Sequence, residues 1–162
     1  MQIYIMRHGQ AEGFTKEDAQ RTLTEHGVAE VAAMANWFSQ HKPDIAQIFV
    51  SPFKRAQQTA QTFCHNANLS ANPETLAFIT PSGSAIDVHD YIDGVIASEK
   101  PSSMLFVSHM PLVSYLVSEL TANEHAPIFQ TGAIAHIDYD IKKMKGELVS
   151  ITSPVDVIEM TQ

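Results

Sequence analysis

Short apolar runs of strand length alternate with longer stretches of helical spacing, and this alternation limits the fold of the chain more than any other feature. The apolar runs occupy residues 2–6, 48–50, 74–79, 104–107, 133–141 and 147–152. Such alternation is typical of α/β proteins, in which helices pack against the faces of a mostly parallel sheet. The sequence therefore predicts a three-layer α/β sandwich, with a mostly parallel central sheet of about six strands flanked by helices.

Helical spacing is clearest after Thr24, a residue type that commonly caps the N-terminus of a helix. The apolar residues that follow lie on one face of the expected helix and form the stripe Val28, Val31, Ala32, Ala35 and Phe38. No linker, internal repeat or low-complexity tract interrupts the pattern. With 162 residues, of which 44% are hydrophobic, the chain is expected to form a single domain over residues 1–162.

The charge balance is acidic, with a formal net charge of -8, so a basic surface for nucleic acid is not expected. The sequence contains only three arginines, Arg7, Arg21 and Arg55. A guanidinium group is the side chain best matched to phosphate or carboxylate. We therefore test the hypothesis that all three arginines serve one anion site.

The cysteine content and the lengths of the apolar runs are those of a soluble protein of a reducing compartment. The one cysteine, Cys64, excludes an internal disulfide and a zinc site made of several cysteines. Residues 2–6 are too short for the apolar core of a signal peptide, and no apolar run approaches the roughly 20 residues of a membrane-spanning helix. We expect a soluble cytoplasmic protein without a membrane partner.

Polar side chains follow three of the expected strands. Arg7 and His8 come after the first strand, Arg55 shortly after the second, and His109 after the fourth. Ligands of open parallel sheets bind outside the carboxyl ends of the strands, so these side chains are expected to converge. Each of them alone also suits a structural role. Together, beside a helix N-terminus, they indicate an anion site.

These residues belong to three longer motifs, namely Arg7-His8-Gly9, residues 51–59 (SPFKRAQQT) and residues 108–111 (SHMP). The combination resembles the histidine phosphatase superfamily, whose fold is called phosphoglycerate mutase-like. The short chain and the residues at 21–24 (RTLT) and 80–83 (TPSG) are most similar to its short bacterial branch, the phosphohistidine phosphatases of the Six type. The resemblance covers residues 1 to about 135, and the last two expected strands contribute no signature.

The resemblance implies a covalent mechanism. His8 would be the nucleophile that accepts the phosphoryl group, and Arg7, Arg55 and His109 would bind its oxygens and stabilise charge in the transition state. Arg21 would be a further phosphate contact. Water would then release phosphate from His8, with no metal or other cofactor.

The sequence departs from the family pattern near the third strand. Larger relatives that act on phosphate esters carry an acidic residue there, in a context like Leu-x-Glu, and this chain has Phe78 at that place. An alcohol leaves badly without a proton donor, whereas a neutral imidazole leaves readily, because its conjugate acid has a pKa of about 6.5. The absence of the acid favours phosphohistidine as the substrate. Glu12 could still act as a substitute proton donor.

The short chain also lacks room for the lid domain of larger relatives, so an open, shallow site is expected that admits a phosphorylated side chain of a folded protein. The partners that the resemblance implies are histidine-containing phosphotransfer domains of multistep histidine kinases, or phosphocarrier proteins of sugar transport. A monomer is expected. Two other functions stay open: a small-molecule phosphomonoesterase with Glu12 as its acid, and a non-catalytic phosphate-binding module.

Other chemistries have weaker support. Cys64 has no arginine six positions later, as a cysteine phosphatase requires, and lies on the apolar face of its expected helix. The Asp138-Tyr139-Asp140 sequence is better explained by alternating polarity on an edge strand than by a phosphotransferase motif. No histidine spacing suits a metal site. We assign the remaining histidines to surface or edge positions: His26, His41, His65, His89, His125 and His136.

Overall fold

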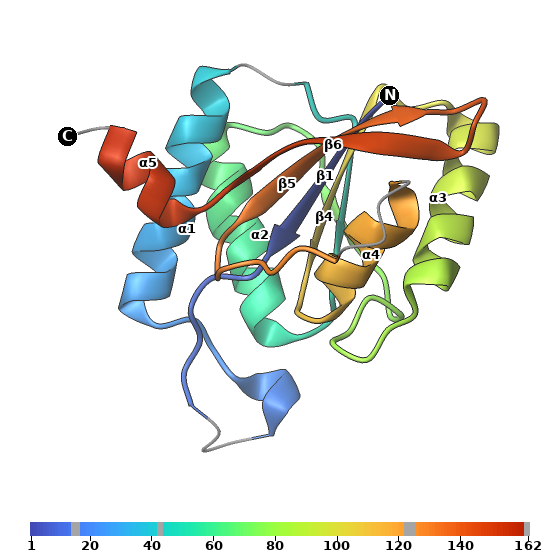
Figure 1. Cartoon of the computed structure of the whole chain (residues 1–162). Helices are drawn as coiled ribbons and strands as arrows, with labels where there is room; N and C mark the ends of the chain where they lie inside the picture. The colour runs from blue at the N-terminus through green and yellow to red at the C-terminus, as the bar shows by residue number, and fades with distance from the viewer. Residues whose placement is uncertain (14–16, 42–43, 122–125, 161–162) are drawn as a thin grey trace.

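A six-stranded mixed sheet forms the centre of the computed structural model, which describes residues 1–13, 17–41, 44–121 and 126–160 (Figure 1). The first four strands in the spatial order are parallel to one another, and the last two strands are added to them by antiparallel pairing. This confirms the predicted α/β fold, although "mostly parallel" is approximate. The spatial order is β3 (Pro73–Thr75), β2 (Gln47–Val50), β4 (Ser103–Ser108), β1 (Gln2–Arg7), β5 (Ile134–Asp140) and β6 (Lys145–Thr152).

Helices cover both faces of this sheet and enclose two apolar cores. Helices α1 (Glu25–Gln40) and α2 (Lys54–Ala67) pack on one face, and α3 (Ala85–Glu99) and α4 (Leu112–Leu120) pack on the other. A C-terminal helix, α5 (Pro154–Met160), packs against α1. The helices α2 and α4 each begin just after a parallel strand, which places their N-termini at the carboxyl edge of the sheet.

Helix α1 begins as predicted, and its buried face contains Val31, Ala35 and Phe38 of the predicted stripe. The Thr24 hydroxyl accepts a hydrogen bond from the Gly27 N–H at 2.9 Å, so the predicted cap is confirmed. Val28, however, is exposed, and Gly27 and Met34 are buried instead. The reason is a close backbone approach, because a Cβ at Gly27 would lie 2.1 Å from the Gln10 carbonyl oxygen.

The chain ends and the third strand also differ from expectation. Strand β3 is three exposed residues at the sheet edge, shorter than the predicted 74–79. Strand β6 begins at Lys145, two residues before the expected run 147–152, and α5 was not predicted. Strand β5 is not an edge strand, because β6 pairs with it, but exposed Asp138 and Asp140 do alternate with buried Tyr139.

Among the five described histidines that were assigned to the surface or to an edge, His89 lies in a different environment. His89 is buried, its Nδ1 lies 3.0 Å from a carboxylate oxygen of Glu119, and its Nε2 lies 2.8 Å from the hydroxyl of Tyr139. The Tyr139 hydroxyl donates in turn to Asp93. The surface assignment of His89 was therefore wrong, because this ring connects α3, α4 and β5. His125 lies outside the described residues.

Candidate active site

Three neighbouring strand ends bring the candidate residues together. Strand β4 pairs with β1 on one side and β2 on the other, so the residues that follow these strands lie in one row. The rings of His8 and His109 lie with centroids 5.0 Å apart, and Nε of Arg55 donates to Nε2 of His8 at 3.3 Å. The predicted convergence of these side chains is what the structure shows.

Gly9 allows the loop after β1 to pass directly over α1. A Cβ at this position would lie 2.8 Å from the Cγ2 atom of Val31 and 2.9 Å from the Gly27 carbonyl oxygen. The Thr59 hydroxyl accepts from the Gly9 N–H at 3.1 Å and donates to the Arg55 carbonyl oxygen at 2.7 Å. One buried hydroxyl thus joins the loop that carries His8 to the helix that carries Arg55.

The geometry of His8 leaves one ring nitrogen ready to attack. Nδ1 lies 2.7 Å from the Gly9 carbonyl oxygen, which can only accept, so Nδ1 carries the proton and Nε2 holds a lone pair. Burial, opposed by the hydrogen bond to Gly9 and reinforced by the charges of Arg55 and Arg7, lowers the pKa of His8 to about 4. At neutral pH the ring is therefore an uncharged nucleophile.

His109 is held in the complementary tautomer by Ser51. The Ser51 hydroxyl accepts from the Phe53 N–H at 3.2 Å, and it lies 2.6 Å from Nε2 of His109. Nε2 is the one acceptor that the described residues offer to the Ser51 hydroxyl, so we assign the hydroxyl proton to this bond and the ring proton to Nδ1. Burial, then the charges of His8 and Arg55, hold the pKa of His109 well below its ordinary value.

Asp18 links two of the three arginines. Its carboxylate accepts from Arg21 at 2.8 Å and from Arg55 at 3.2 Å, and its backbone carbonyl accepts from Arg55 at 2.6 Å. Burial alone would raise the pKa of Asp18, but the hydrogen bonds and charges of the two arginines lower it. Asp18 belongs to a short 3-10 helix (Asp18–Gln20) in the loop between β1 and α1.

Two buried donors beside His8 have no hydrogen-bond partner among the described residues. They are Nε of Arg7 and Nδ1 of His109. The Arg7 side chain is otherwise fixed by a 2.7 Å bond from Nη1 to the Phe129 carbonyl oxygen. Unpaired buried donors are rare and call for an explanation, such as an ion that completes the site. A tetrahedral oxyanion next to His8 would supply acceptors for both.

Glu12, the candidate proton donor, and Arg21, the expected phosphate contact, are linked to the His8 cluster through other residues. Glu12 is exposed, and its backbone carbonyl accepts from Nε of Arg21 at 2.8 Å. Arg21 therefore reaches the cluster through Asp18 in this structure. Phe78 is an exposed residue that packs edge-on against Tyr91.

Sequence reasoning missed three residues of this site: Asp18, Ser51 and Thr59. Ser51 and Thr59 are the first and last residues of the 51–59 motif, but their roles depend on the three-dimensional partners described above. Asp18 lies three residues before Arg21, a spacing at which charged side chains can pair in a helical turn. That spacing is the one local signal for it.

The remaining features are consistent with other roles. Cys64 lies partly buried against the core, and burial raises the pKa of its thiol to about 11, which disfavours a thiolate nucleophile. Within the described ranges, no three His, Cys, Asp or Glu side chains are grouped to hold a metal ion. No helix in those ranges is long and apolar enough to span a membrane.

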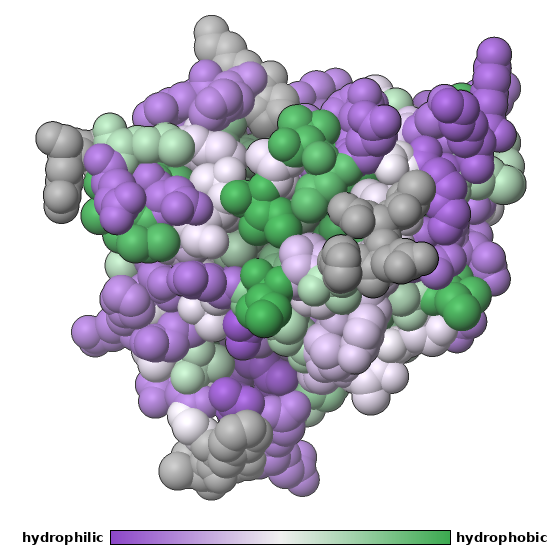
Figure 2. Space-filling view, in the orientation of Figure 1, coloured by the Kyte–Doolittle hydropathy of each residue, from purple (hydrophilic) through white to green (hydrophobic). Residues whose placement is uncertain are grey.

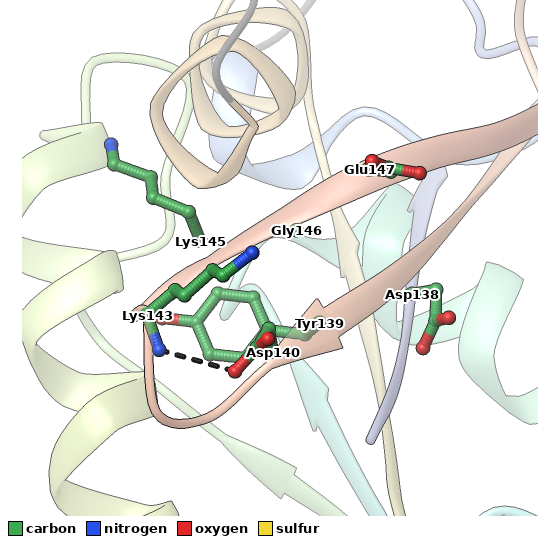
Figure 3. Close-up of a pocket in the computed structure, with 7 residues that line it drawn as sticks. All are labelled: Asp138, Tyr139, Asp140, Lys143, Lys145, Gly146 and Glu147. Carbon is green, nitrogen blue, oxygen red and sulfur yellow. Dashed lines mark hydrogen bonds between the residues drawn. The ribbon is translucent and has the colours of Figure 1, made fainter.

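A hollow on the β5–β6 hairpin lies apart from this cluster (Figure 3). Within it, Oδ1 of Asp140 accepts from the backbone N–H of Lys143 at 3.1 Å. None of its lining residues belongs to the histidine and arginine cluster, so the hollow is not the phosphate site. Its lining consists of Asp138, Tyr139, Asp140, Lys143, Lys145, Gly146 and Glu147.

Comparison with known proteins shows close relatives over most of the chain. Residues 3–76 match the sequence model of the histidine phosphatase superfamily, branch 1. Phosphohistidine phosphatase SixA of Escherichia coli strain K12 is 41% identical over 140 residues, which are 86% of this chain and 86% of that protein. A phosphohistidine phosphatase SixA homolog of Haemophilus influenzae is 35% identical over 162 residues, covering 96% of this chain and 98% of that protein.

Solved structures agree with the sequence relatives. The protein histidine phosphatase SixA complexed with tungstate has a TM-score of 0.92 at 39% identity and covers 97% of this chain and 99% of its own. A mycobacterial glucosyl-3-phosphoglycerate phosphatase, at 14% identity and a TM-score of 0.71 over 91% of this chain and 96% of its own, shares the fold. The resemblance expected from the three motifs is confirmed. The chain belongs to the histidine phosphatase superfamily, in its Six-type branch.

Proposed function

We propose that this protein is a phosphohistidine phosphatase that hydrolyses phosphate from a histidine of a partner protein, through a phosphohistidine formed on His8. The pair of unpaired buried donors, Nε of Arg7 and Nδ1 of His109, beside the neutral His8 ring carries the proposal. The similarity to SixA, including a structure that holds tungstate, a tetrahedral oxyanion like phosphate, supports it. Both relatives found by sequence are named as phosphohistidine phosphatases or a homolog of one.

The reaction has two steps. In the first, the lone pair on Nε2 of His8 forms a bond to phosphorus while the bond from phosphorus to the substrate imidazole breaks, and the substrate ring, which carries a proton on its other nitrogen, leaves as neutral imidazole. In the second, water attacks the phosphorus of phosphorylated His8, the bond to Nε2 breaks, and inorganic phosphate leaves with the neutral ring restored. Neither step consumes a cofactor.

Fixed donors around His8 stabilise the charge on the phosphoryl oxygens. Nε of Arg55, which donates to Nε2 of His8 in the free protein, transfers its hydrogen bond to a phosphoryl oxygen when the substrate arrives. Arg7 and His109 contribute their unpaired donors. Because Asp18 and Ser51 already hold Arg55 and His109 in place, little reorganisation is needed during the reaction.

The acid–base properties of the site favour a phosphoramidate over a phosphate ester. The carboxylate in contact with the arginines is Asp18, and its lowered pKa makes it a poor proton donor. An alkoxide leaving group requires such a donor, whereas an imidazole leaving group does not. Phosphomonoesterase activity would depend instead on Glu12, which is exposed at the rim.

The proposal includes the finer expectations from the sequence. These are a single domain over residues 1–162, a cytoplasmic monomer, and a partner that is either a histidine-containing phosphotransfer domain or a phosphocarrier protein. The absence of a lid domain expected from the chain length suits such a partner, because a shallow site admits a side chain presented by a folded protein.

The test is to trap the phosphorylated enzyme. A phosphotransfer domain labelled on its histidine is mixed with the wild type, with His8→Ala, and with His65→Ala as a control for an exposed histidine on α2. We expect acid-labile label on the wild type and on His65→Ala, and neither label nor turnover with His8→Ala. Label retained by His8→Ala contradicts the covalent mechanism. Faster hydrolysis of a sugar phosphate assigns the protein to the phosphomonoesterases, and phosphate binding without turnover makes it a binding module.

A further inference from the structure

We propose that one side of the phosphate site, which we call the uncharged rim, is the docking surface for the partner protein, and that the partner carries its phosphohistidine among apolar side chains. The uncharged rim consists of the exposed and partly exposed residues of the segments 78–86, 110–115 and 126–131. None of these residues is Asp, Glu, Lys, Arg or His, although 17% of the chain is charged. The inference rests on the proposed function and adds the surface that would select the partner.

The three segments of the uncharged rim are joined to each other and to the site. The second segment follows His109 directly, and the third provides the Phe129 carbonyl oxygen that accepts from Arg7. The hydroxyl of Ser114 on α4 donates to the Pro127 carbonyl oxygen. A Cβ at Gly83 would lie 3.0 Å from a methyl group of Leu112, so the first segment lies against the start of α4.

Large apolar side chains of the uncharged rim are exposed to solvent. The exposed fractions are 84% for Ile128, 60% for Ile86, 58% for Tyr115 and 38% for Phe78. Pro111 is also exposed and lies one helical turn before Tyr115, so the two share a face of α4. Single exposed apolar residues are common, but a group of them beside a binding site indicates an interaction surface.

The opposite side of the site is charged. It contains Glu12, Asp18 and Arg21 from the loop after β1, and exposed Lys54 at the start of α2. Figure 2 shows purple surface at the bottom, over the loop that holds the short 3-10 helix, and paler surface above it to the right, below the position of α4 in Figure 1. The phosphoryl group therefore enters between a polar and a weakly polar surface.

The position of His8 requires close contact with the partner. Its side chain is buried, with only 7% of the residue exposed, so a phosphorylated imidazole must enter the site for Nε2 to reach phosphorus. A partner with charged groups against the uncharged rim would lose their hydration without gaining ion pairs. Apolar side chains around the phosphohistidine, as on the exposed face of a helix, avoid this cost and bury the rim.

The test compares two pairs of substitutions. Tyr115→Ser with Ile128→Ser alters the uncharged rim, and Val149→Ser with Val155→Ser is the matched control on β6 and α5, where the residues are 57% and 48% exposed. Each protein is assayed with a phosphorylated histidine-containing phosphotransfer domain and with phosphoramidate. Binding of the phosphorylated domain is also measured by calorimetry with each pair in a His8→Ala background, so that the affinity is measured in the absence of turnover.

We expect the rim pair to lower kcat/KM for the domain roughly ten-fold or more through KM, to weaken binding equally, and to leave phosphoramidate hydrolysis unchanged. The control pair should match the wild type. Equal binding by both pairs, or equal losses in both, overturns the docking surface. A wild-type dimer that the rim pair dissociates in sedimentation assigns the rim to a second copy of the chain and overturns it too. If the wild type binds the domain but hydrolyses neither substrate, the proposed function is refuted. The docking surface is then tested by the binding measurements alone.

Discussion

Replacing Ser51 with alanine removes the hydroxyl that fixes the tautomer of His109. The hydroxyl accepts from the Phe53 N–H and lies 2.6 Å from Nε2 of His109, and both Ser51 and His109 are buried. Without it, the ring proton is free to move from Nδ1 to Nε2. Nδ1 then faces the phosphoryl group as an acceptor instead of a donor, so the variant loses one donor to the transition state.

Two magnitudes follow from this geometry. Leaving a buried polar atom without its partner costs about 1–3 kcal/mol, and water has little access to replace the hydroxyl. Since every 1.4 kcal/mol is about a ten-fold change, kcat should fall roughly ten-fold to a hundred-fold. The same loss destabilises the fold, and each 1 kcal/mol lowers the Tm of a protein this long by about 2–4 °C.

A second buried serine separates the effect on catalysis from the effect on stability. Ser108 donates to the Ile79 carbonyl oxygen at 2.8 Å and does not contact a histidine ring in the described hydrogen bonds. Ser51→Ala and Ser108→Ala are compared by single-turnover release of phosphate and by thermal unfolding. We expect similar falls in Tm but a slower reaction only for Ser51→Ala. Equal rates for the two variants would refute the tautomer argument.

Three further outcomes are expected. The pH profile of kcat/KM, corrected for spontaneous hydrolysis, should keep its acid limb near pH 4, because His8 with a pKa of about 4 stays neutral above that pH; a limb near 6.5 contradicts the environment described for this ring. Arg55→Ala should lower the rate on the order of 10²-fold or more and weaken tungstate binding, with a milder effect for Arg21→Ala; equal losses in both assays would show that Arg21 contacts the phosphate directly. Asp18→Asn should reduce the free energy of unfolding by about 1 kcal/mol at neutral pH, because the carboxylate is partly exposed. Since the folded pKa of Asp18 is lowered, that difference from the wild type is full above the unfolded pKa and disappears as the pH falls through the folded pKa; a constant difference in acid denaturant titrations contradicts it.

The sequence predicted most of the fold because the order of its elements is a local property. Apolar runs and helical spacing mark β1, β2, β4 and α4 within short windows of sequence, and the strand ends then follow. The face of α1 depends instead on a contact between Gly27 and Gln10, which lie 17 residues apart, and no helical periodicity contains it. The pairing of β5 with β1 likewise depends on residues far apart in the chain.

The same distinction holds for the candidate site. His8 and His109 follow strands directly and Arg55 lies shortly after β2, so the rule for parallel sheets was enough to group them. The role of Ser51 depends on a ring 58 residues away, and that of Asp18 on a guanidinium 37 residues away. His89 was assigned to the surface but is buried. Its polar partners on α4 and β5 make a buried position acceptable for a residue type often found at the surface.

The direction of β1 has a practical consequence for attaching this protein to a surface. The strand begins at Gln2 and ends at Arg7, so the chain enters the sheet at the edge opposite His8, about 20 Å away at roughly 3.3 Å per residue. The amino group of Met1 donates to the Tyr139 carbonyl oxygen at 3.1 Å, and an amide N–H at that position can make the same bond. A peptide linker joined to Met1 therefore immobilises the molecule with its phosphate site and uncharged rim facing the solution, accessible to a protein partner in flow.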